Sequence, residues 1–364
     1  MSARLPEYPS PALRDCPYPF FEQARTEAPV YKSPHRDEYL VFGHEEIEYV
    51  LRHHELYSEE LPEGTLMDCG AETMISAVPP PKHTAMRRLA SRPFTPGRLR
   101  AVEPQVRRIV DELIDGFLDR GEVELMHDFA LLLPAILTCE LMDLPTEGPE
   151  WELILGQWAG TIDGADNMNE EYWPGLVEYF EGKVRERLEQ PGDDIISELI
   201  RLQVDEDGAP NVPYLTVIAT ELMVGGAGTT GLMIVNAMWL LLEHPDQLEL
   251  VRSDFSLIPA MLEESLRVES VILDRERIEA VDTVLGGVAF PAGARLRLVL
   301  GSGNRDERVF ADADRFDVTR RHTELKQHFG FGYGIHFCLG APLARLEGQV
   351  AFEQLFTRLD NLRF

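Results

Sequence analysis

Apolar residues recur three or four positions apart through most of this chain, which is the spacing of one face of an α-helix. Segments with this pattern are 104–119, 127–142, 175–189, 194–203, 213–243 and 258–268. Strand-like alternation is confined to short pieces near Val30 and Tyr31 and at 39–42, 284–290 and 295–299, with glycine-containing turns at 286–287 and 291–293. The pattern therefore predicts a mainly α protein with a small β region.

Length and composition allow a large core, since 44% of the 364 residues are hydrophobic. Length alone permits one large domain or two or three small ones, and no shift in composition marks a boundary. The longest stretch of low polarity, 129–142, is too short to span a bilayer and is expected to be a core helix. The first 20 residues, rich in proline and charge, show no signal-peptide pattern.

The charge balance is strongly acidic, with 34 Lys and Arg against 63 Asp and Glu, a net charge of −29. This argues against nucleic acid or an anionic membrane as the main partner. Segment 79–108 departs from the trend, because Glu103 is its one acid and its eight basic residues are Lys82, Arg87, Arg88, Arg92, Arg98, Arg100, Arg107 and Arg108. The four cysteines have neither paired spacing nor a companion histidine cluster, which favours a reducing cytoplasm.

The helix predicted over 213–243 has an unusual centre, Gly225-Gly226-Ala227-Gly228-Thr229-Thr230. A glycine inside a helix costs about 1 kcal/mol relative to alanine. Such a cluster indicates that the backbone approaches something bulky or that the helix opens, and close helix–helix packing is the alternative. The Thr229 hydroxyl is expected to bond the Gly225 carbonyl one turn back or to turn toward a ligand.

A glycine-rich loop near the C-terminus reads Phe-Gly-Tyr-Gly-Ile-His-Phe-Cys-Leu-Gly over 331–340. It places Cys338 at the start of a predicted helix, where unpaired backbone N–H groups stabilise a thiolate and make it a ready metal ligand. The three glycines let the backbone lie flat against a large planar partner, and haem fits that description. The alternative is a buried structural cysteine in a glycine-rich turn.

This loop resembles the haem-ligand loop of the cytochromes P450, which reads Phe, two residues, Gly, three residues, Cys, one residue, Gly. The fixed positions are matched by Phe331, Gly334, Cys338 and Gly340. The central helix resembles the oxygen-binding helix of the same family, with Gly225 and Gly226 at its small positions and Thr229 at its threonine. Gly228 stands where the family has an acid, which is the main departure.

Two further stretches extend the resemblance. Residues 80–96 resemble the helix that contacts the haem propionates, and Glu264-Ser-Leu-Arg267 resembles the Glu-x-x-Arg motif. In the family this pair joins a later arginine to brace the fold, and Arg315 is the expected third member. The resemblance implies a single domain over 1–364, folded as a helix-rich triangular prism with haem between the long central helix and the helix after the cysteine.

The resemblance also implies a function. Haem b (iron protoporphyrin IX) would be ligated by Cys338, lie against Phe331, Gly340, Gly225 and Gly226, and be held through its propionates by His83, Arg87, Arg277 and His336. The protein would be a monooxygenase that inserts oxygen from O2 into a hydrophobic small molecule. Electrons would come from NAD(P)H through a ferredoxin reductase and a ferredoxin, which would dock on the basic segment 79–108. A cytoplasmic monomer is expected.

Alternatives follow from the departures. With Gly228 beside Thr229, proton delivery would depend on the hydroxyl, ordered water or a substrate group, because Glu221 lies about 80° round the helix from Thr229. Use of peroxide, an atypical oxidation or a non-catalytic haem sensor therefore stays open. Only 26 residues follow Cys338, so the hairpin that usually ends the family's fold is short or missing.

Substrate choice is expected to depend on four segments, which the resemblance assigns to the walls of the substrate pocket. Several of them are apolar, which favours a hydrophobic substrate. They are 61–78, 158–173, 222–226 and 271–273.

Overall fold

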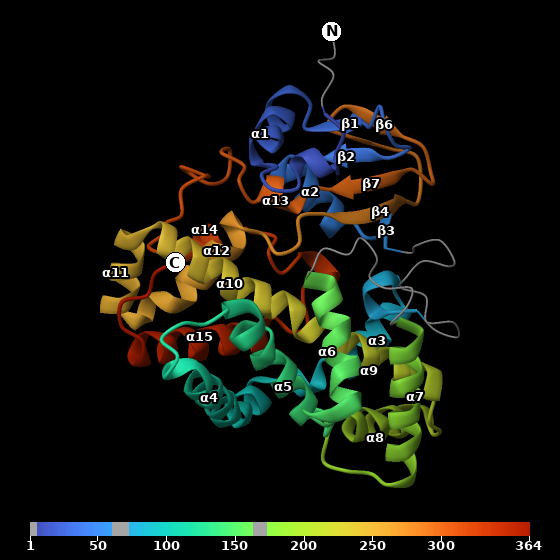
Figure 1. Cartoon of the computed structure of the whole chain (residues 1–364). Coiled ribbons are helices and arrows are strands. Elements are labelled where there is room, and N and C mark those ends of the chain that lie inside the picture. Colours follow the sequence, from blue (N-terminus) through green and yellow to red (C-terminus); the bar gives the residue numbers. More distant parts are fainter. Residues whose placement is uncertain (1–5, 60–72, 163–172) are drawn as a thin grey trace. The chain divides into compact units, whose positions relative to one another are not determined.

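The computed structural model describes residues 6–59, 73–162 and 173–364. Its described part is rich in helices and contains two small sheets, as the spacing of apolar residues predicts (Figure 1). The chain divides into two compact units. Unit 1 comprises Met1–Leu61 and Glu243–Cys338, and unit 2 comprises Pro62–Leu242 and Leu339–Phe364.

Unit 1 contains a five-stranded sheet with the order β1-β2-β7-β4-β3. Neighbouring strands are antiparallel except for β2 and β7, which are parallel. A separate hairpin joins β5 to β6 through Gly286 and Gly287, whose φ angles of 56° and 79° suit a two-residue turn. The strands are β1 (Val30–Lys32), β2 (Tyr39–Val41), β3 (Tyr57–Ser58), β4 (Arg275–Glu279), β5 (Thr283–Leu285), β6 (Val288–Phe290) and β7 (Arg295–Leu298).

Helix α2 (His44–Arg52) packs beside this sheet. Its Ile47 and Val50 share a core with Val41 and Leu298 of the sheet, and Figure 1 shows α2 next to the strands. The helices of unit 1 are α1 (Tyr18–Glu27), α2 (His44–Arg52), α11 (Pro245–Ser253), α12 (Ile258–Val268), α13 (Leu300–Gly303) and α14 (His322–Leu325), with short 3-10 turns η1 (Pro11–Leu13), η5 (Phe255–Leu257) and η6 (Gly334–His336).

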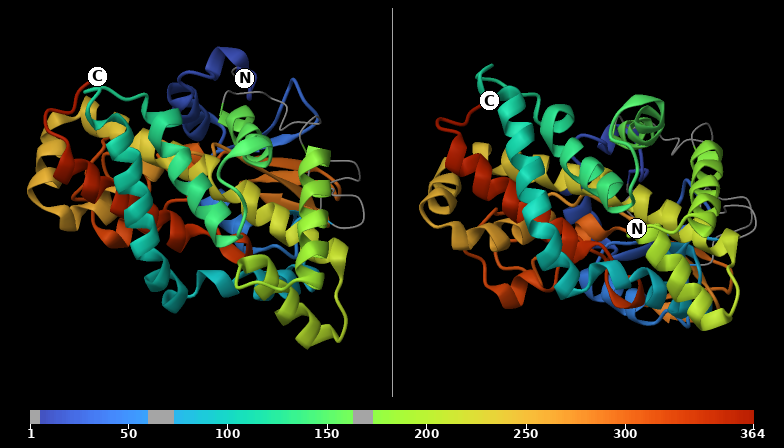
Figure 2. Two further views of the ribbon diagram at one scale, coloured as in Figure 1. Left: turned by 60° about the horizontal axis from the view of Figure 1, so that its bottom comes forward. Right: turned by 90° about the horizontal axis from the view of Figure 1, so that it is seen from below.

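Unit 2 is helical in its described part, with α15 lying alongside α4 (Figure 2). Arg107 on α4 and Glu353 on α15 form an ion pair of 2.9 Å. The longer helices are α3 (Lys82–Ala90), α4 (Pro96–Leu118), α5 (Leu132–Leu141), α6 (Gly148–Ile162), α7 (Trp173–Glu189), α8 (Ile195–Asp207), α9 (Val212–Gly226), α10 (Gly228–Glu243) and α15 (Ala341–Arg358). The short turns are η2 (Ile75–Ala77), η3 (Arg92–Phe94) and the π-helical η4 (Met126–Ala130).

The helix predicted over 213–243 is two helices, α9 and α10, which are separated at Ala227. The side chain of Asn211 caps the start of α9 by accepting a hydrogen bond from the Tyr214 N–H at 3.3 Å, and Pro213 occupies the first turn. The combined stretch is apolar and long enough to cross a membrane, but 61% of its most apolar window is buried in the structure. A core helix has these properties, and we read α9 and α10 in that way.

A buried ion-pair cluster in unit 1 corrects one prediction. The side chains of Glu264 and Arg267 on α12 are fully buried and joined by hydrogen bonds of 2.8 Å. The third member is Arg320, whose Nε donates to both Glu264 oxygens at 3.0 and 3.1 Å. The expectation that Arg315 completes the cluster is wrong.

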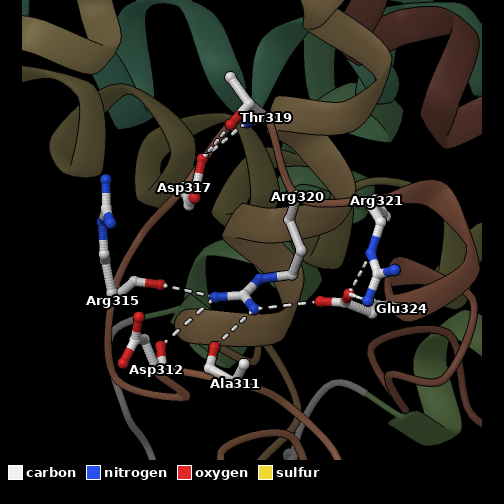
Figure 3. Close-up of a pocket in the computed structure, with 8 residues that line it drawn as sticks. All are labelled: Ala311, Asp312, Arg315, Asp317, Thr319, Arg320, Arg321 and Glu324. Atoms are coloured by element: carbon white, nitrogen blue, oxygen red, sulfur yellow. Dashed lines mark hydrogen bonds and ion pairs between the residues drawn. The ribbon is translucent and has the colours of Figure 1, made fainter.

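Arg315 contributes its main chain to the same region. Its carbonyl oxygen accepts hydrogen bonds from Arg267 and Arg320, at 3.0 and 3.3 Å. Figure 3 shows the Arg320 guanidinium reaching the carbonyls of Ala311, Asp312 and Arg315, while the Arg315 side chain points away. Arg320 rather than Arg315 therefore belongs to the ion-pair cluster, because its side chain points toward Glu264.

Candidate functional site

The loop that carries Cys338 is held in shape by its backbone. The Cys338 N–H donates to the Phe331 carbonyl at 2.8 Å, and the Gly332 N–H donates to the Phe329 carbonyl at 2.8 Å. Gly332 and Gly334 have φ angles of 72° and 71°, in the left-handed region that favours glycine. A Cβ at Gly334 would collide with the Leu51 carbonyl on α2. These two glycines are therefore needed for the turn and for its contact with α2.

Cys338 differs from the other described cysteines in its surroundings. It is exposed at the end of the loop, two residues before Gly340, which caps α15. Cys139 is buried in unit 2, and burial raises the pKa of its thiol to about 12. Cys16 is exposed near the N-terminus. Among these three, the thiol suited to bind an open-faced partner is Cys338, whereas Cys139 is an inert core residue.

Arg277 and His336 are brought together by a residue that the sequence did not single out, Glu59. Arg277 Nη2 lies 2.7 Å from one Glu59 oxygen, and His336 Nε2 lies 2.9 Å from the other. All three side chains are largely buried. Burial alone would raise the pKa of Glu59, but His336 and Arg277 outweigh this and hold that pKa below its usual value. The carboxylate is therefore charged and bridges the Arg277 guanidinium and the His336 imidazole.

The strand pairing explains how Glu59 reaches this place. Ser58 on β3 pairs with Ile278 on β4, so the residue after β3 lies beside Arg277. The sequence did not indicate Glu59 as a neighbour of Arg277, because a two-residue strand has no periodic pattern of its own. Arg277 Nε is buried without a hydrogen-bond partner in the part of the chain that the structure describes.

Arg275 is a second cationic residue that sequence reasoning did not propose for the site. It lies two residues before Arg277 on β4, so both side chains are on one face of the strand. Its side chain is accessible to solvent. Burial nevertheless lowers the pKa of Arg275, partly offset by the charges of Asp274 and Cys338. The charge of Cys338 acts on the Arg275 guanidinium, so Arg275 is a candidate cationic neighbour of the sulfur.

Thr229 lies just after the break between α9 and α10. Its hydroxyl donates to the Gly225 carbonyl at 3.2 Å, which is one of the two arrangements expected from the sequence. Both Thr229 and Gly225 are exposed, whereas Gly228 is buried. The break therefore presents a hydroxyl and bare backbone at one place on the helix.

The three glycines near the break have different surroundings. A Cβ at Gly226 would lie 2.9 Å from Thr138 Oγ1 on α5, so Gly226 serves helix packing. A Cβ at Gly225 or Gly228 would meet nothing within 4 Å. The sequence left two explanations of these glycines open, close helix packing and a backbone open to a partner. Gly226 fits the packing explanation, whereas Gly225 and Gly228 leave the backbone open.

Glu221 on α9 binds backbone N–H groups of a neighbouring segment. Its two carboxylate oxygens accept hydrogen bonds from the backbone N–H groups of Ile75 at 2.6 Å and Ser76 at 3.0 Å. These two residues begin η2. The carboxylate therefore binds a short loop segment of unit 2.

His83 and Arg87 lie four residues apart on α3, in unit 2. His83 is buried and Arg87 is half-buried. Because His83 is buried, it is not an exposed residue at the start of the helix. Both side chains share one helix face, as the spacing predicts.

The predicted basic surface is reduced by internal ion pairs. Arg98 pairs with Glu198, Arg107 with Glu103 and Glu353, and Arg108 with Glu112 and Glu140. Arg92 and Arg100 are exposed. The positive charge that this segment offers to a partner is therefore expected mainly at Arg92 and Arg100, because the charges of Arg98, Arg107 and Arg108 are balanced by nearby carboxylates.

Of the four segments expected to line a substrate pocket, two lie largely outside the described residues, namely 61–72 and 163–172. Residues 74–78 are described, and Met74, Ile75 and Val78 are buried in the same core cluster as Met223 and Ala227 of unit 2. Val271 to Leu273 are half-buried in unit 1. The described residues contain no group of three or more His, Cys, Asp or Glu side chains that would hold a bare metal ion.

Comparisons with known proteins agree with these features. A family model described as "Cytochrome P450" matches residues 163–361. The chain is 39% identical over 287 residues to 6-deoxyerythronolide B hydroxylase of Saccharopolyspora erythraea. That alignment covers 78% of this chain and 70% of the hydroxylase. It is 34% identical over 358 residues to vitamin D(3) 25-hydroxylase of Pseudonocardia autotrophica, covering 95% of this chain and 87% of that protein.

The fold also matches solved structures. CYP109E1 from Bacillus megaterium in complex with testosterone superposes with a TM-score of 0.86 and 28% sequence identity. The match covers 94% of this chain and 90% of that one.

Proposed function

This chain belongs to the cytochrome P450 family, and on that premise we propose that Cys338 ligates a haem b and that the enzyme oxygenates a hydrophobic small molecule. The observation that carries the proposal is the position of Cys338. Its thiol is exposed at the end of a rigid, glycine-shaped loop, with the cationic Arg275 as an electrostatic neighbour. A thiolate ligand would supply the electron density with which haem iron activates oxygen.

The residues present fit a haem. A soft thiolate is a known axial ligand of haem iron, and two carboxylates on an otherwise apolar group need cationic partners. Arg275, Arg277 and His336 supply such groups in unit 1. Arg277 has a buried N–H without a partner among the described residues, and Arg275 is accessible. In unit 2 we assign the same task to His83 and Arg87.

Bound haem would supply the oxygen and electron chemistry, and the protein side chains would position and protonate. Cys338 would hold the iron by its sulfur, and the loop backbone fixes that sulfur in place. Gly225 offers bare backbone, and the Thr229 hydroxyl offers a proton donor and acceptor. To donate to a ligand, that hydroxyl must turn away from the Gly225 carbonyl, to which it donates at 3.2 Å, whereas it can accept a hydrogen bond without turning.

Electrons come from redox partners in this family, and for this chain we propose NAD(P)H, a ferredoxin reductase and a ferredoxin. The exposed Arg92 and Arg100 support an acidic partner. A cytoplasmic monomer agrees with the net charge of −29 and with the buried apolar helices. A hydrophobic substrate agrees with relatives named for hydroxylating 6-deoxyerythronolide B and vitamin D3.

The test is turnover with isotopically labelled O2, using the purified protein with a ferredoxin, its reductase and a hydrophobic substrate. Screening for the substrate uses the spin-state change of the haem spectrum on binding. One labelled oxygen atom in the product is the expected result. A product whose new oxygen comes from water would contradict the proposal.

Gly228 favours a second candidate, turnover driven by peroxide. Thr229 has no acid beside it, and Glu221 is bound to the η2 backbone. A general acid contributes about 10²- to 10⁴-fold to a rate that depends on it. Because a Cβ at Gly228 would meet nothing within 4 Å, there is room to build an acid there.

Gly228→Asp is expected to raise the yield of product per NAD(P)H consumed while leaving the peroxide-driven rate nearly unchanged. Gly228→Asn is the matched control, since it has similar size without the acid. If the wild-type protein already couples NAD(P)H tightly to product and the two variants behave alike, proton delivery does not depend on this position.

A further inference from the structure

Glu221 makes a contact across 145 residues of sequence that no feature of the chain's pattern indicates. From the interior of α9, its carboxylate binds the first two N–H groups of η2, at 2.6 Å from Ile75 N and 3.0 Å from Ser76 N. Hydrogen bonds to a charged group are about twice as strong as neutral ones. Two of them on one carboxylate fix both the position and the orientation of η2.

The local sequence cannot supply this cap. Met74 precedes η2, and its side chain has no oxygen to accept the N–H groups that a helical turn leaves unpaired. Without Glu221, the N–H groups of Ile75 and Ser76 would have to find another acceptor. The segment therefore depends on a side chain from α9 for the role that a neighbouring Ser or Asp usually performs.

Apolar packing sets the same segment against unit 2. Met74, Ile75 and Val78 are buried and belong to the cluster that includes Met223 and Ala227. Met223 lies two residues after Glu221 on α9. Hydrogen bonds and apolar contacts thus hold 74–78 against the second half of this helix.

The position of Glu221 on α9 relates its contact with η2 to the proposed oxygen site. Glu221, Gly225 and Thr229 follow one another at intervals of four, which keeps them within about 80° on one side of the helix. Gly225 and Thr229 are exposed and are the residues that we assign to the oxygen site. Eight residues of helix span about 12 Å, which is the distance along the helix from Glu221 to Thr229. Glu221 therefore holds η2 at one end of the helix side that carries Gly225 and Thr229.

We propose that Glu221 is a positioning residue that fixes η2 as one wall of the substrate site, and that it thereby selects for bulky apolar substrates. This inference rests on the proposed function. A wall that is already ordered does not have to be ordered by the substrate, and ligands that touch it bind more tightly for that reason. Small ligands that do not reach η2 gain nothing from the contact.

The test uses Glu221→Ala and Glu221→Gln in the haem-containing protein. In the orientation of Glu221, where each oxygen accepts from a different N–H, a glutamine keeps one acceptor oxygen and turns its NH2 toward the other N–H. Glu178→Gln on α7 is the control, because Glu178 is an exposed acid of the same unit. Hydrogen exchange is measured at the amides of Ile75 and Ser76, and binding is measured by the spectral change with imidazole and with 4-phenylimidazole.

Both Glu221 variants should exchange faster at these two amides and bind 4-phenylimidazole about tenfold more weakly, because the ligand would then have to order the segment itself. Their affinity for imidazole should stay within about twofold, and the control should match wild type. Unchanged exchange, or faster exchange without a change in the ratio of the two affinities, would overturn the proposal. A protein that shows no thiolate-ligated haem would instead refute the proposed function itself.

Discussion

Two glycines three residues apart on α10 have opposite surroundings, and their substitutions should differ accordingly. A Cβ at Gly231 would lie 3.0 Å from the Ala130 carbonyl oxygen and 3.3 Å from Leu131 Cα, both backbone atoms that cannot turn aside. A Cβ at Gly228 would meet nothing within 4 Å. Gly231 is therefore required by packing, whereas Gly228 is not.

Gly231→Ala should lower the free energy of unfolding by about 1–3 kcal/mol through overpacking. Gly228→Ala should leave it unchanged or raise it by up to about 1 kcal/mol, since alanine is the better helix former. Denaturant unfolding of the two variants measures the difference. Equal destabilisation by both would contradict the account of these glycines.

Sequence reasoning at this scale recognised residues but not their neighbours. The cluster at 225–230 is visible in the sequence because three glycines in one helix are improbable. Their separate roles are not, because Thr138, which faces Gly226, comes from a distant part of the chain. Glu59 was missed for the same reason, since its contact with Arg277 depends on the pairing of β3 with β4.

At the scale of elements, the cluster of Glu264, Arg267 and Arg320 ties α12 to the irregular segment that follows α13. Arg267 donates to the carbonyls of Asn304 and Ala313, at 2.9 and 2.6 Å, as well as to Glu264. Removing one partner leaves a charge buried without compensation, which costs about 3–5 kcal/mol. The cluster is therefore expected to be essential for the fold of unit 1.

Arg320→Ala should lose most of its haem and unfold at a lower denaturant concentration than wild type. Arg315→Ala should retain full haem content, because only its main chain takes part. Haem absorbance per mole of protein measures both. Full haem in the Arg320 variant, or loss of haem in the Arg315 variant, would reverse the assignment.

Elements with a clear period were predictable. The segments 104–119, 175–189 and 258–268 lie in α4, α7 and α12, apart from one residue beyond the end of α4. The spacing did not indicate β3, which has only two residues, or the break between α9 and α10. Periodicity records which face is apolar and carries no information about a local opening of the backbone. The choice between Arg315 and Arg320 likewise required the direction of each side chain.

At the scale of the whole molecule, the net charge of −29 would repel an acidic redox partner unless positive charge is gathered locally. Internal ion pairs engage Arg98, Arg107 and Arg108. Arg92 and Arg100 are exposed. We therefore expect these two, rather than the whole basic segment, to steer an acidic ferredoxin.

The double variant Arg92→Glu, Arg100→Glu should be reduced by ferredoxin about tenfold more slowly at low salt, with the difference shrinking as salt rises. Arg108→Gln is the control, because that arginine is engaged with Glu112 and Glu140. Stopped-flow reduction gives the rate constants. Equal rates for the double variant and wild type would remove the basic segment from partner docking.

The central claim is that the Cys338 thiolate ligates haem iron, and its most direct test is the carbon monoxide difference spectrum of the reduced protein. Wild type should show the red-shifted Soret band that a thiolate ligand produces, and Cys139→Ser should show the same band. Cys338→Ser should lose that band even where haem remains bound. A Cys338→Ser protein that keeps the thiolate-type spectrum would contradict the account.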